Sequence, residues 1–502
     1  MSETIIAADI GTSSLKAALV TPAGEVLATS RQGYSTHVTP QGWTEQDPHD
    51  WLRALADSLR VLATNCDLAA ISGIVFTGHM SAALLVDALN APVRPCIIWS
   101  DQRAEEEARN AEATAGRDKL YALTGNPATP TYSAPKLAWI ARHEPEAMKR
   151  ARFFVQPKDW MVAQLTERTA TDTSDASCTN LIDLRKGQWE PALFELYGID
   201  VRLAPEILRS TDVAGPLLPN IAFWLGLKPG LPVIMGSGDG PATAAGAGAL
   251  FQGDGYVSLG TSAWASFTST DPVVDKGCRL ATFAHLIPGL YVETGSMQAA
   301  GASLEWAAQI IGVTAGELAE LALTTATPLG SKPFFVPYLQ GERTPYWSAL
   351  PAGTFFGLSR EHGRADIANA VLEGICFQMR LILEVFQELG RTTEPLTLAG
   401  GFGQSSLFQQ RFADLTGRSV RTLSKSEHST ALGAALAGFL GLGCLDTPEK
   451  AAGWLRLGEV VVPTGDARPI TARFKSFRDA WPHAQALGAL GVRPALETKE
   501  GN

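Results

Sequence analysis

Short apolar runs of strand length alternate with amphipathic segments along the first part of the chain. Two apolar runs, residues 5–10 and 15–20, flank a polar turn at 11–14, which predicts two strands joined by a tight turn. Apolar residues then recur at helical spacing over 51–62 behind an Asp-Pro pair, which predicts a helix. Further strands are expected at residues 71–76 and 83–86. Because strands and helices alternate, the pattern indicates an α/β domain.

The pattern of the N-terminal segment recurs in the second half of the chain. An apolar run at 256–259 leads into a Gly-Thr-Ser turn, and a second apolar run follows at 263–267. We interpret this order as an internal repeat with one copy in each domain. The glycine-rich stretch 236–248 precedes the second copy and is the predicted junction between domains at residues 1–245 and 246–502. Such a junction predicts an active-site cleft between the two domains.

Length and composition narrow the class of protein. A chain of 502 residues exceeds what one hydrophobic core usually supports, which agrees with two domains. The net charge of -10 and the absence of a basic block argue against a nucleic-acid partner. The six cysteines form no CxxC pair and no zinc-ligand pattern, which is typical of reduced thiols in a cytoplasmic protein. The longest apolar stretch, 431–442, is too short to span a bilayer, so no membrane contact is expected.

The first polar turn is a candidate phosphate-binding loop. A tight turn between strands can point successive backbone N–H groups at a phosphate, and the hydroxyls of Thr12, Ser13 and Ser14 add donors. Asp9, at the end of the preceding strand, is a candidate Mg²⁺ ligand, directly or through water. In the second turn Ser258 takes the place of Asp9, so only one magnesium site is expected. An ordinary hairpin with a polar turn is the alternative.

Two further glycine-rich turns carry candidate residues. Asp239 follows an apolar run and is surrounded by glycines. A carboxylate at a strand end beside a cleft can accept the proton of a substrate hydroxyl during phosphoryl transfer, and an Asp here can also cap a helix that starts at Pro241. Gly400 and Gly401 lie between a predicted strand and a predicted helix at 405–415, a turn that suits nucleotide contacts but is a weak signal alone.

Together these segments resemble the FGGY family of carbohydrate kinases, part of the superfamily of actin, hexokinase and Hsp70 folds. The resemblance runs from Ile5 to about Gly443. It is carried by residues 42–48 (GWTEQDP), 136–140 (KLAWI), 341–345 (GERTP), and Gly353, Phe355, Phe356, Gly357, Leu358, Asp366, Ile367, Glu373 and Gly374. It implies an α/β protein of two actin/hexokinase-like (ribonuclease H-like) domains with an active-site cleft between them, in which residues 1–245 bind the sugar and 246–502 bind ATP.

The resemblance carries the family's functional residues onto matching positions of this chain. Asp239 falls on the catalytic base, and Asp9 falls on the acidic residue near the magnesium ion. The positions that match ATP contacts are Thr12, Ser13 and Ser14 in the first loop, Gly260 and Thr261 in the second, Gly301 and Glu305 at a helix start, and Gly400, Gly401 and Gln404 in the adenosine loop. The resemblance therefore implies a kinase that uses ATP and Mg²⁺ to phosphorylate a small sugar or polyol.

Within the family, xylulokinases look most similar. Segments 157–160 (PKDW), 170–177 (ATDTSDAS) and 99–103 (WSDQR) resemble theirs. The positions expected to bind the acceptor are His79, Met80, Ser81, Trp99, Asp101, Arg103 and Asp239. Ser81 aligns with the sugar-contacting His of that subfamily, and Gly240 stands where an Asn is common. Because a serine is too short to make the same contact as a His, and a glycine lacks the donor and acceptor of an Asn side chain, we expect a different acceptor to be preferred over D-xylulose.

Several alternatives stay open from the sequence. Within the family, the acceptor can be another ketose, a polyol or an aldonate, as in kinases of the gluconate, erythritol or glycerol type. From another class, an actin- or Hsp70-like ATPase without a sugar substrate would share the repeat, although the KLAWI segment and the motif near Phe355 argue against it. A catalytically inactive homologue is disfavoured by Asp9 and Asp239. The oligomeric state is open, with a homodimer as one option.

Overall fold

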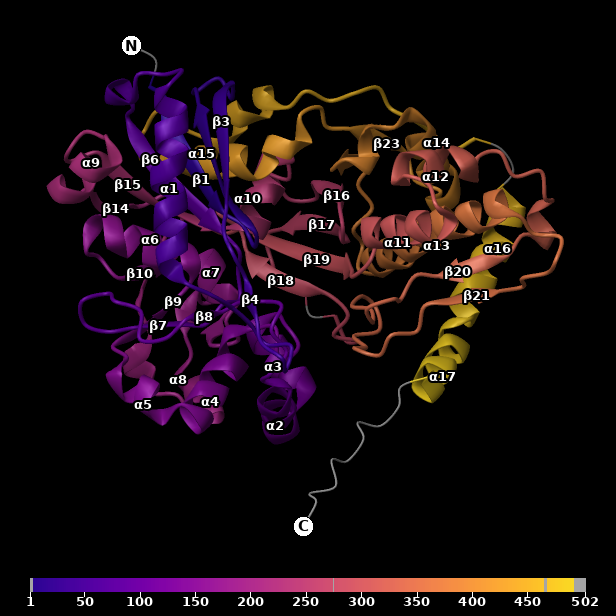
Figure 1. Cartoon of the computed structure of the whole chain (residues 1–502), viewed down its shortest axis with the longest axis horizontal. Coiled ribbons are helices and arrows are strands. Elements are labelled where there is room, and N and C mark those ends of the chain that lie inside the picture. The colour runs from indigo at the N-terminus through magenta and orange to yellow at the C-terminus, as the bar shows by residue number, and fades with distance from the viewer. Residues whose placement is uncertain (1–2, 274, 465–466, 492–502) are drawn as a thin grey trace. The chain divides into compact units, whose positions relative to one another are not determined.

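The computed structural model describes residues 3–273, 275–464 and 467–491. The chain forms two compact units, and each is discontinuous in sequence (Figure 1). Unit 1 takes in the residues up to Asp254 together with Phe267–Glu293 and Lys425–Arg456, and unit 2 takes in Gly255–Ser266, Thr294–Ser424 and the residues from Leu457 onward. Because the units interleave along the chain, the single domain boundary at residues 245–246 stays a prediction.

Unit 1 is built on a six-stranded sheet with the order β14-β15-β6-β1-β2-β3. These strands are β1 (Ile5–Ile10), β2 (Ser14–Val20), β3 (Val26–Gly33), β6 (Gly73–Gly78), β14 (Val213–Pro216) and β15 (Pro232–Gly238). β1, β6 and β15 run parallel to one another, whereas β2 runs antiparallel to β1. The carboxyl ends of the three parallel strands therefore meet at one edge of the sheet. The predicted strand pair at the N-terminus is confirmed.

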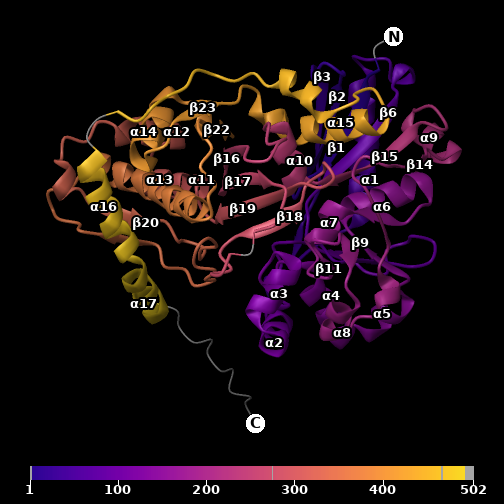
Figure 2. The same cartoon turned by 180° about the vertical axis from the view of Figure 1, so that it is seen from behind.

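Alternating residues of β1 bury against helices on the two faces of this sheet. Ile6 and Ile10 belong to the apolar cluster that includes α1 (Pro48–Ala63), whereas Ile5 and Ala7 pack in the cluster with α15 (Ser429–Gly441). Figure 1 shows α1 in front of the sheet, and Figure 2 shows the face that carries α15. The predicted helix start is confirmed, because Asp47 caps α1 and accepts the His49 N–H at 2.9 Å.

Helices α10 (Asp239–Gly246) and α15 pack backbone to backbone in unit 1. A Cβ atom on Gly433 would lie 1.8 Å from the carbonyl oxygen of Ala242, so only glycine fits there. The hydroxyls of Thr243 and Thr430 also lie 2.8 Å apart. The predicted helix start at Pro241 is wrong by two residues, because α10 begins at Asp239 with Gly238 as its N-cap residue. Asp239 therefore lies in the first helical turn.

Unit 2 repeats the strand pattern of unit 1. Five consecutive strands of a six-stranded sheet have the order β19-β17-β16-β22-β23. They are β16 (Gly255–Leu259), β17 (Ala263–Ser269), β19 (Tyr291–Met297), β22 (Leu396–Ala399) and β23 (Val420–Thr422). As β1 lies between its turn partner β2 and the parallel strand β6, β16 lies between β17 and the parallel strand β22. The predicted internal repeat is confirmed by this match. The helix predicted at 405–415 is α14 (Ser406–Thr416).

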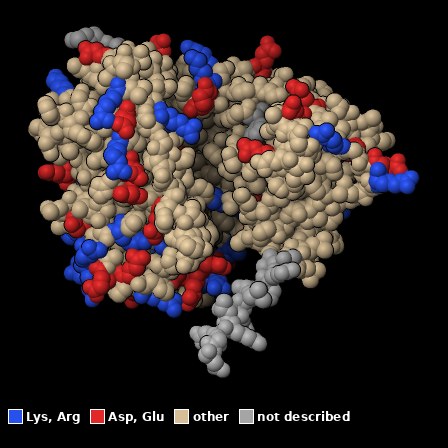
Figure 3. Space-filling view, viewed as in Figure 1, with Lys and Arg blue, Asp and Glu red and all other residues tan. Residues whose placement is uncertain are grey.

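The surface and the thiols agree with a globular, unbridged chain. All six cysteines are free. Across the described residues, no helix combines the length and the apolar character needed to cross a membrane. On the face of unit 1 shown in Figure 3, Lys and Arg intermingle with Asp and Glu, without a large area of one sign.

Candidate active site

The ends of three parallel strands bring predicted functional residues together in unit 1. In the register of these strands, Ile10 is paired with Gly78, and Gly78 is paired with Gly238. The next residues are Gly11 after β1, His79 after β6 and Asp239 after β15. The His79 N–H donates to the Ile10 carbonyl at 2.9 Å, which continues the pairing beyond the strands. Asp9, His79 and Asp239 consequently lie at the same edge of the sheet.

The two carboxyl groups at this edge have raised pKa values. Burial raises the pKa of Asp9 to about 6, partly offset by the positive charge of Lys16. Asp239 keeps partial exposure, yet the surrounding protein removes enough water from its carboxylate to raise its pKa to about 7, and the negative charge of Asp9 adds to the increase. Such values suit a group that must both hold and release a proton near neutral pH.

The surroundings of Asp9 fit a magnesium ion that is mostly bound by other ligands. Asp9 Oδ1 is buried and has no hydrogen-bond partner among the described residues. The described part of the chain contains no cluster of three or more His, Cys, Asp or Glu side chains that could hold a metal. Mg²⁺ commonly takes one or two protein carboxylates and completes its shell with water and substrate phosphates. This arrangement agrees with a magnesium site at Asp9, which stays a prediction.

The first polar turn is held by side chains from other segments of unit 1. Gly11 N–H donates to the Ser14 carbonyl at 3.1 Å. Trp99 Nε1 donates to Thr12 Oγ1 at 2.9 Å, and Gln46 Nε2 donates to the Thr12 carbonyl at 2.6 Å. Ser13 is exposed, whereas Ser14 is buried on β2 and its hydroxyl accepts a bond from Arg31 at 3.0 Å. Of the three predicted loop residues, Ser13 thus has the most accessible side chain.

The segment after β6 contains the predicted acceptor contacts His79, Met80 and Ser81. His79 is buried, and neither ring nitrogen has a hydrogen-bond partner among the described residues. Burial, followed by the charge of Lys136, lowers the pKa of His79 to about 3, so its ring is neutral. Met80 approaches the base segment, because a Cβ atom on Gly240 would lie 3.5 Å from the Met80 sulfur. Ser81 has a left-handed backbone with φ of 65°.

Asp101 and Arg103 are engaged with each other and with neighbouring side chains. Their charged groups form an ion pair at 2.8 Å, and both are almost fully buried. Arg103 also pairs with Glu45 at 2.7 Å, and its guanidinium lies 4.4 Å from the ring centroid of Trp43. The charged groups of both predicted acceptor contacts are therefore engaged with protein side chains in this structure.

The predicted nucleotide contacts of the C-terminal half gather in unit 2. The Gly301 N–H donates to the Gly260 carbonyl at 2.9 Å, so α11 (Gly301–Ile311) begins directly on the second polar turn. Glu305 is exposed on this helix, and Thr261 accepts the N–H groups of Ala300 and Ala302, both at 3.0 Å. Gly400 has φ of 94°, and a Cβ atom there would lie 2.2 Å from the Leu259 carbonyl oxygen. Gln404 donates to the Leu423 carbonyl at 2.9 Å.

The fold and these two groups of residues define a two-domain phosphotransferase of the actin/hexokinase-like class. Residues 4–246 match the N-terminal domain of the FGGY family of carbohydrate kinases, and residues 255–442 match its C-terminal domain. The chain belongs to this family. It is a sugar kinase, and ATP is its phosphoryl donor.

Sequence and structure relatives extend over nearly the whole chain. The xylulose kinase of Escherichia coli K12 is 31% identical over 430 residues, which are 86% of this chain and 88% of the relative. The crystal structure of xylulose kinase from Rhodospirillum rubrum has a TM-score of 0.88 at 29% identity and covers 97% of this chain and 100% of that chain. The gluconate kinase structure from Lactobacillus acidophilus has a TM-score of 0.89 at 25% identity and covers 97% of this chain and 99% of that chain.

Sequence reasoning missed several residues that build the site. Gln46 holds Thr12, and its Oε1 accepts the Trp51 indole N–H at 3.1 Å, while the Trp51 ring contacts His79 edge-on at 5.9 Å between centroids. Gln46 lies in the GWTEQDP segment and Lys136 in the KLAWI segment, but neither segment by itself predicts these contacts. Their partners lie far away in the sequence, and no periodicity encodes such contacts.

Proposed function

We propose that this sugar kinase depends on Mg²⁺ and uses Asp239 as the general base that activates a hydroxyl group of a small sugar, polyol or aldonate. The observation that carries the proposal is the row of Asp9, His79 and Asp239 at the ends of adjacent parallel strands. A cytoplasmic location is part of the proposal and is supported by the six free thiols.

In this mechanism the acceptor oxygen attacks the γ-phosphorus of ATP. A new O–P bond forms, the bond to the β,γ-bridging oxygen breaks, and the hydroxyl proton passes to the Asp239 carboxylate as ADP leaves. A magnesium ion held by Asp9, water and the nucleotide phosphates would supply positive charge for the phosphoryl group. The neutral ring of His79 can donate one hydrogen bond and accept another, which suits a polyhydroxylated acceptor.

The preferred acceptor is proposed to differ from D-xylulose. The relatives named as xylulose kinases make that sugar the first compound to test. However, the short side chain of Ser81 stands where a longer His is expected. Both backbone polar groups of Ser81, the N–H and the carbonyl, form hydrogen bonds. Its N–H donates to Cys178 Sγ at 3.1 Å, and its carbonyl accepts from Lys136 Nζ at 2.9 Å. The turn is therefore anchored against a shift toward the ligand, and each lost sugar contact costs ~0.5–1.5 kcal/mol.

A panel assay coupled to ADP release tests the proposal. The panel includes D-xylulose, other ketoses, pentitols, tetritols, glycerol and aldonates such as gluconate, with an acceptor-free control. We expect one compound to exceed D-xylulose in kcat/KM by at least ~10-fold, which corresponds to about 1.4 kcal/mol of transition-state binding. If D-xylulose gives the highest kcat/KM, the proposed acceptor preference is wrong. Equal ADP release without any acceptor would instead favour the ATPase alternative.

A further inference from the structure

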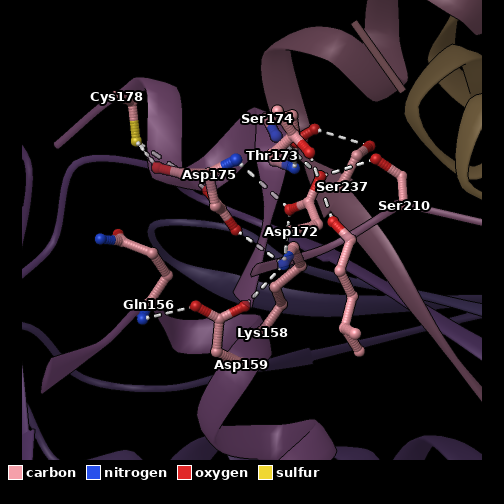
Figure 4. Close-up of polar contacts among 12 residues, drawn as sticks. Gln156, Lys158, Asp159, Asp172, Thr173, Ser174, Asp175, Cys178, Ser210 and Ser237 are labelled. Carbon is pink, nitrogen blue, oxygen red and sulfur yellow. Dashed lines mark hydrogen bonds and ion pairs between the residues drawn. The ribbon is translucent and has the colours of Figure 1, made fainter. Parts of the chain in front are cut away.

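Unit 1 contains a buried cluster of one lysine and three aspartates (Figure 4). Lys158 lies at the start of α6 (Pro157–Thr166). Its Nζ is 2.6 Å from Asp159 Oδ1, 2.8 Å from Asp172 Oδ1 and 3.0 Å from Asp175 Oδ2, and all four side chains are at most 1% exposed. Burying charges is expensive even when they are paired. Stability alone therefore does not explain a buried cluster of three acids and one base.

The cluster fixes the short helix α7 (Thr173–Ser177). Asp172 is the N-cap residue of α7, and its carboxylate accepts the N–H groups of Ser174 at 2.9 Å and Asp175 at 3.3 Å. The same carboxylate accepts the Ser210 hydroxyl at 2.6 Å. A helix of five residues is not stable by itself. Lys158 therefore pins α7 at its N-cap residue and within its first turn.

One end of α7 holds the segment that carries the general base. The Ser174 hydroxyl accepts the backbone N–H of Gly238 at 2.9 Å, and Gly238 directly precedes Asp239. Ser174 is fully buried, so water does not compete for this bond. Any displacement of α7 must consequently move the Gly238 backbone or break its hydrogen bond.

The other end of α7 holds the turn that carries the predicted acceptor contacts. Cys178 is the C-cap residue of α7, and its sulfur accepts a hydrogen bond from the Ser81 N–H at 3.1 Å. The thiol in turn donates to the Asp175 carbonyl at 3.0 Å, which ties it to the helix. The five-residue helix is therefore bonded to the base segment through Ser174 and to the acceptor turn through Cys178.

We propose that α7, pinned by Lys158, is a positioning element that sets where Asp239 stands relative to the acceptor-binding turn at Ser81. This inference rests on the proposed function, because it takes Asp239 as the base and residues 79–81 as acceptor contacts. Ser174, Cys178 and Lys158 act through other residues and are positioning residues. Proton transfer demands that the base and the hydroxyl stay within hydrogen-bond distance, and a misplacement of about 1 Å can reduce the rate ~10²-fold.

The two ends of α7 give separable kinetic signatures. We expect Ser174→Ala to lower kcat at least ~10-fold while the KM for ATP stays within about twofold, because it releases only the base segment. We expect Cys178→Ala to raise the KM for the best acceptor of the panel, and Cys178→Ser, which keeps a hydrogen-bonding atom, to restore most of it. Thr173→Ala is the matched control on the same helix, because its hydroxyl donates to the Leu208 carbonyl at 3.3 Å and to neither Gly238 nor Ser81. It should change neither parameter.

A double-mutant cycle distinguishes positioning from general stabilisation. If Ser174 acts through Asp239, adding Ser174→Ala to Asp239→Asn should lower the residual kcat by less than about twofold. Multiplicative losses, or a wild-type kcat for Ser174→Ala alone, would overturn the inference. An Asp239→Asn enzyme with full kcat would instead refute the proposed base, so the two failures are distinct. Lys158→Met leaves three buried carboxylates without a cation. If the Lys158→Met variant does not fold, the Ser174 and Cys178 variants still decide the test.

Discussion

Individual carboxyl groups at the strand ends differ from those on the surface mainly in their access to water. Asp9 and Asp239 sit where burial raises both pKa values, and the charge of Asp9 adds to the shift at Asp239. By contrast, Asp57 on α1 is exposed and pairs with Arg60. The same side-chain chemistry is thus exposed to water at Asp57, whereas at Asp239 it has the raised pKa that suits the proposed proton transfer.

Asp239→Asn should fold normally and lose most of its turnover. The amide keeps the size of the side chain but cannot accept the hydroxyl proton, and general-base assistance typically contributes ~10²–10⁴-fold to the rate. Steady-state assays with the best acceptor measure the loss in kcat. Asp57→Asn is the control and should keep wild-type kcat. Near wild-type turnover for the Asp239 variant would show that another group takes the proton.

The activity should depend on pH around neutrality. Asp239 works as a base only when ionised, and its raised pKa of about 7 means that the ionised fraction falls as pH drops below that value. We therefore predict that kcat/KM falls about tenfold per pH unit well below pH 7 and levels off above it. In Asp239→Asn the acid limb should move to lower pH, where protonation of Asp9, with its pKa of about 6, still removes the proposed magnesium ligand. A profile that is flat from pH 5 to 8 is incompatible with this assignment.

Single residues also mark the limit of prediction from sequence. Asp9 and Asp239 are recognisable because each follows an apolar run and borders glycine-rich turns. Lys158 and its three aspartates lie in the PKDW and ATDTSDAS segments that carry the resemblance to xylulokinases, but the sequence assigns none of the four a role. Only the folded chain reveals that α6 and α7 bring them together. Their positioning role has no signal in local periodicity.

At the scale of elements, the contact between α10 and α15 is close enough to require glycine. We predict that Gly433→Ala lowers the free energy of unfolding by about 1–3 kcal/mol, because the added methyl would lie 1.8 Å from the Ala242 carbonyl and force the helices apart. Denaturant titration measures the change. Gly453→Ala is the matched control, since a Cβ atom there meets nothing within 4 Å. Equal stability of the two variants would refute the packing argument.

The elements themselves were largely predictable. Apolar runs gave the positions of β1, β2, β16 and β22, and the Asp-Pro start gave α1, because these patterns follow from burial on one or both faces. The start of α10 was misplaced because Pro241 is a strong helix-start signal, whereas the helix already begins at Asp239. α7 has only five residues, which is too short to show a helical period.

At the scale of the whole molecule, the predicted acceptor contacts belong to unit 1 and most predicted nucleotide contacts belong to unit 2. Phosphoryl transfer requires the two ligands to meet with water excluded. We predict that saturating acceptor together with a non-hydrolysable ATP analogue lowers the radius of gyration measured by small-angle scattering. The ATP analogue with a non-substrate sugar serves as the control. An unchanged radius, with binding of both ligands verified by calorimetry, would contradict the prediction.

The membership of α15 in unit 1 has a consequence for synthesis on the ribosome. Translation reaches residues 429–441 only after nearly all of the residues that unit 2 contributes to its sheet. Until α15 emerges, the face of the N-terminal sheet that carries Ile5, Ala7 and Val75 lacks this cover, and exposed apolar strands in nascent chains invite aggregation. The unit that is translated first is therefore completed late. A premature stop codon before residue 429 would damage the N-terminal unit even though the lesion lies far downstream of its strands.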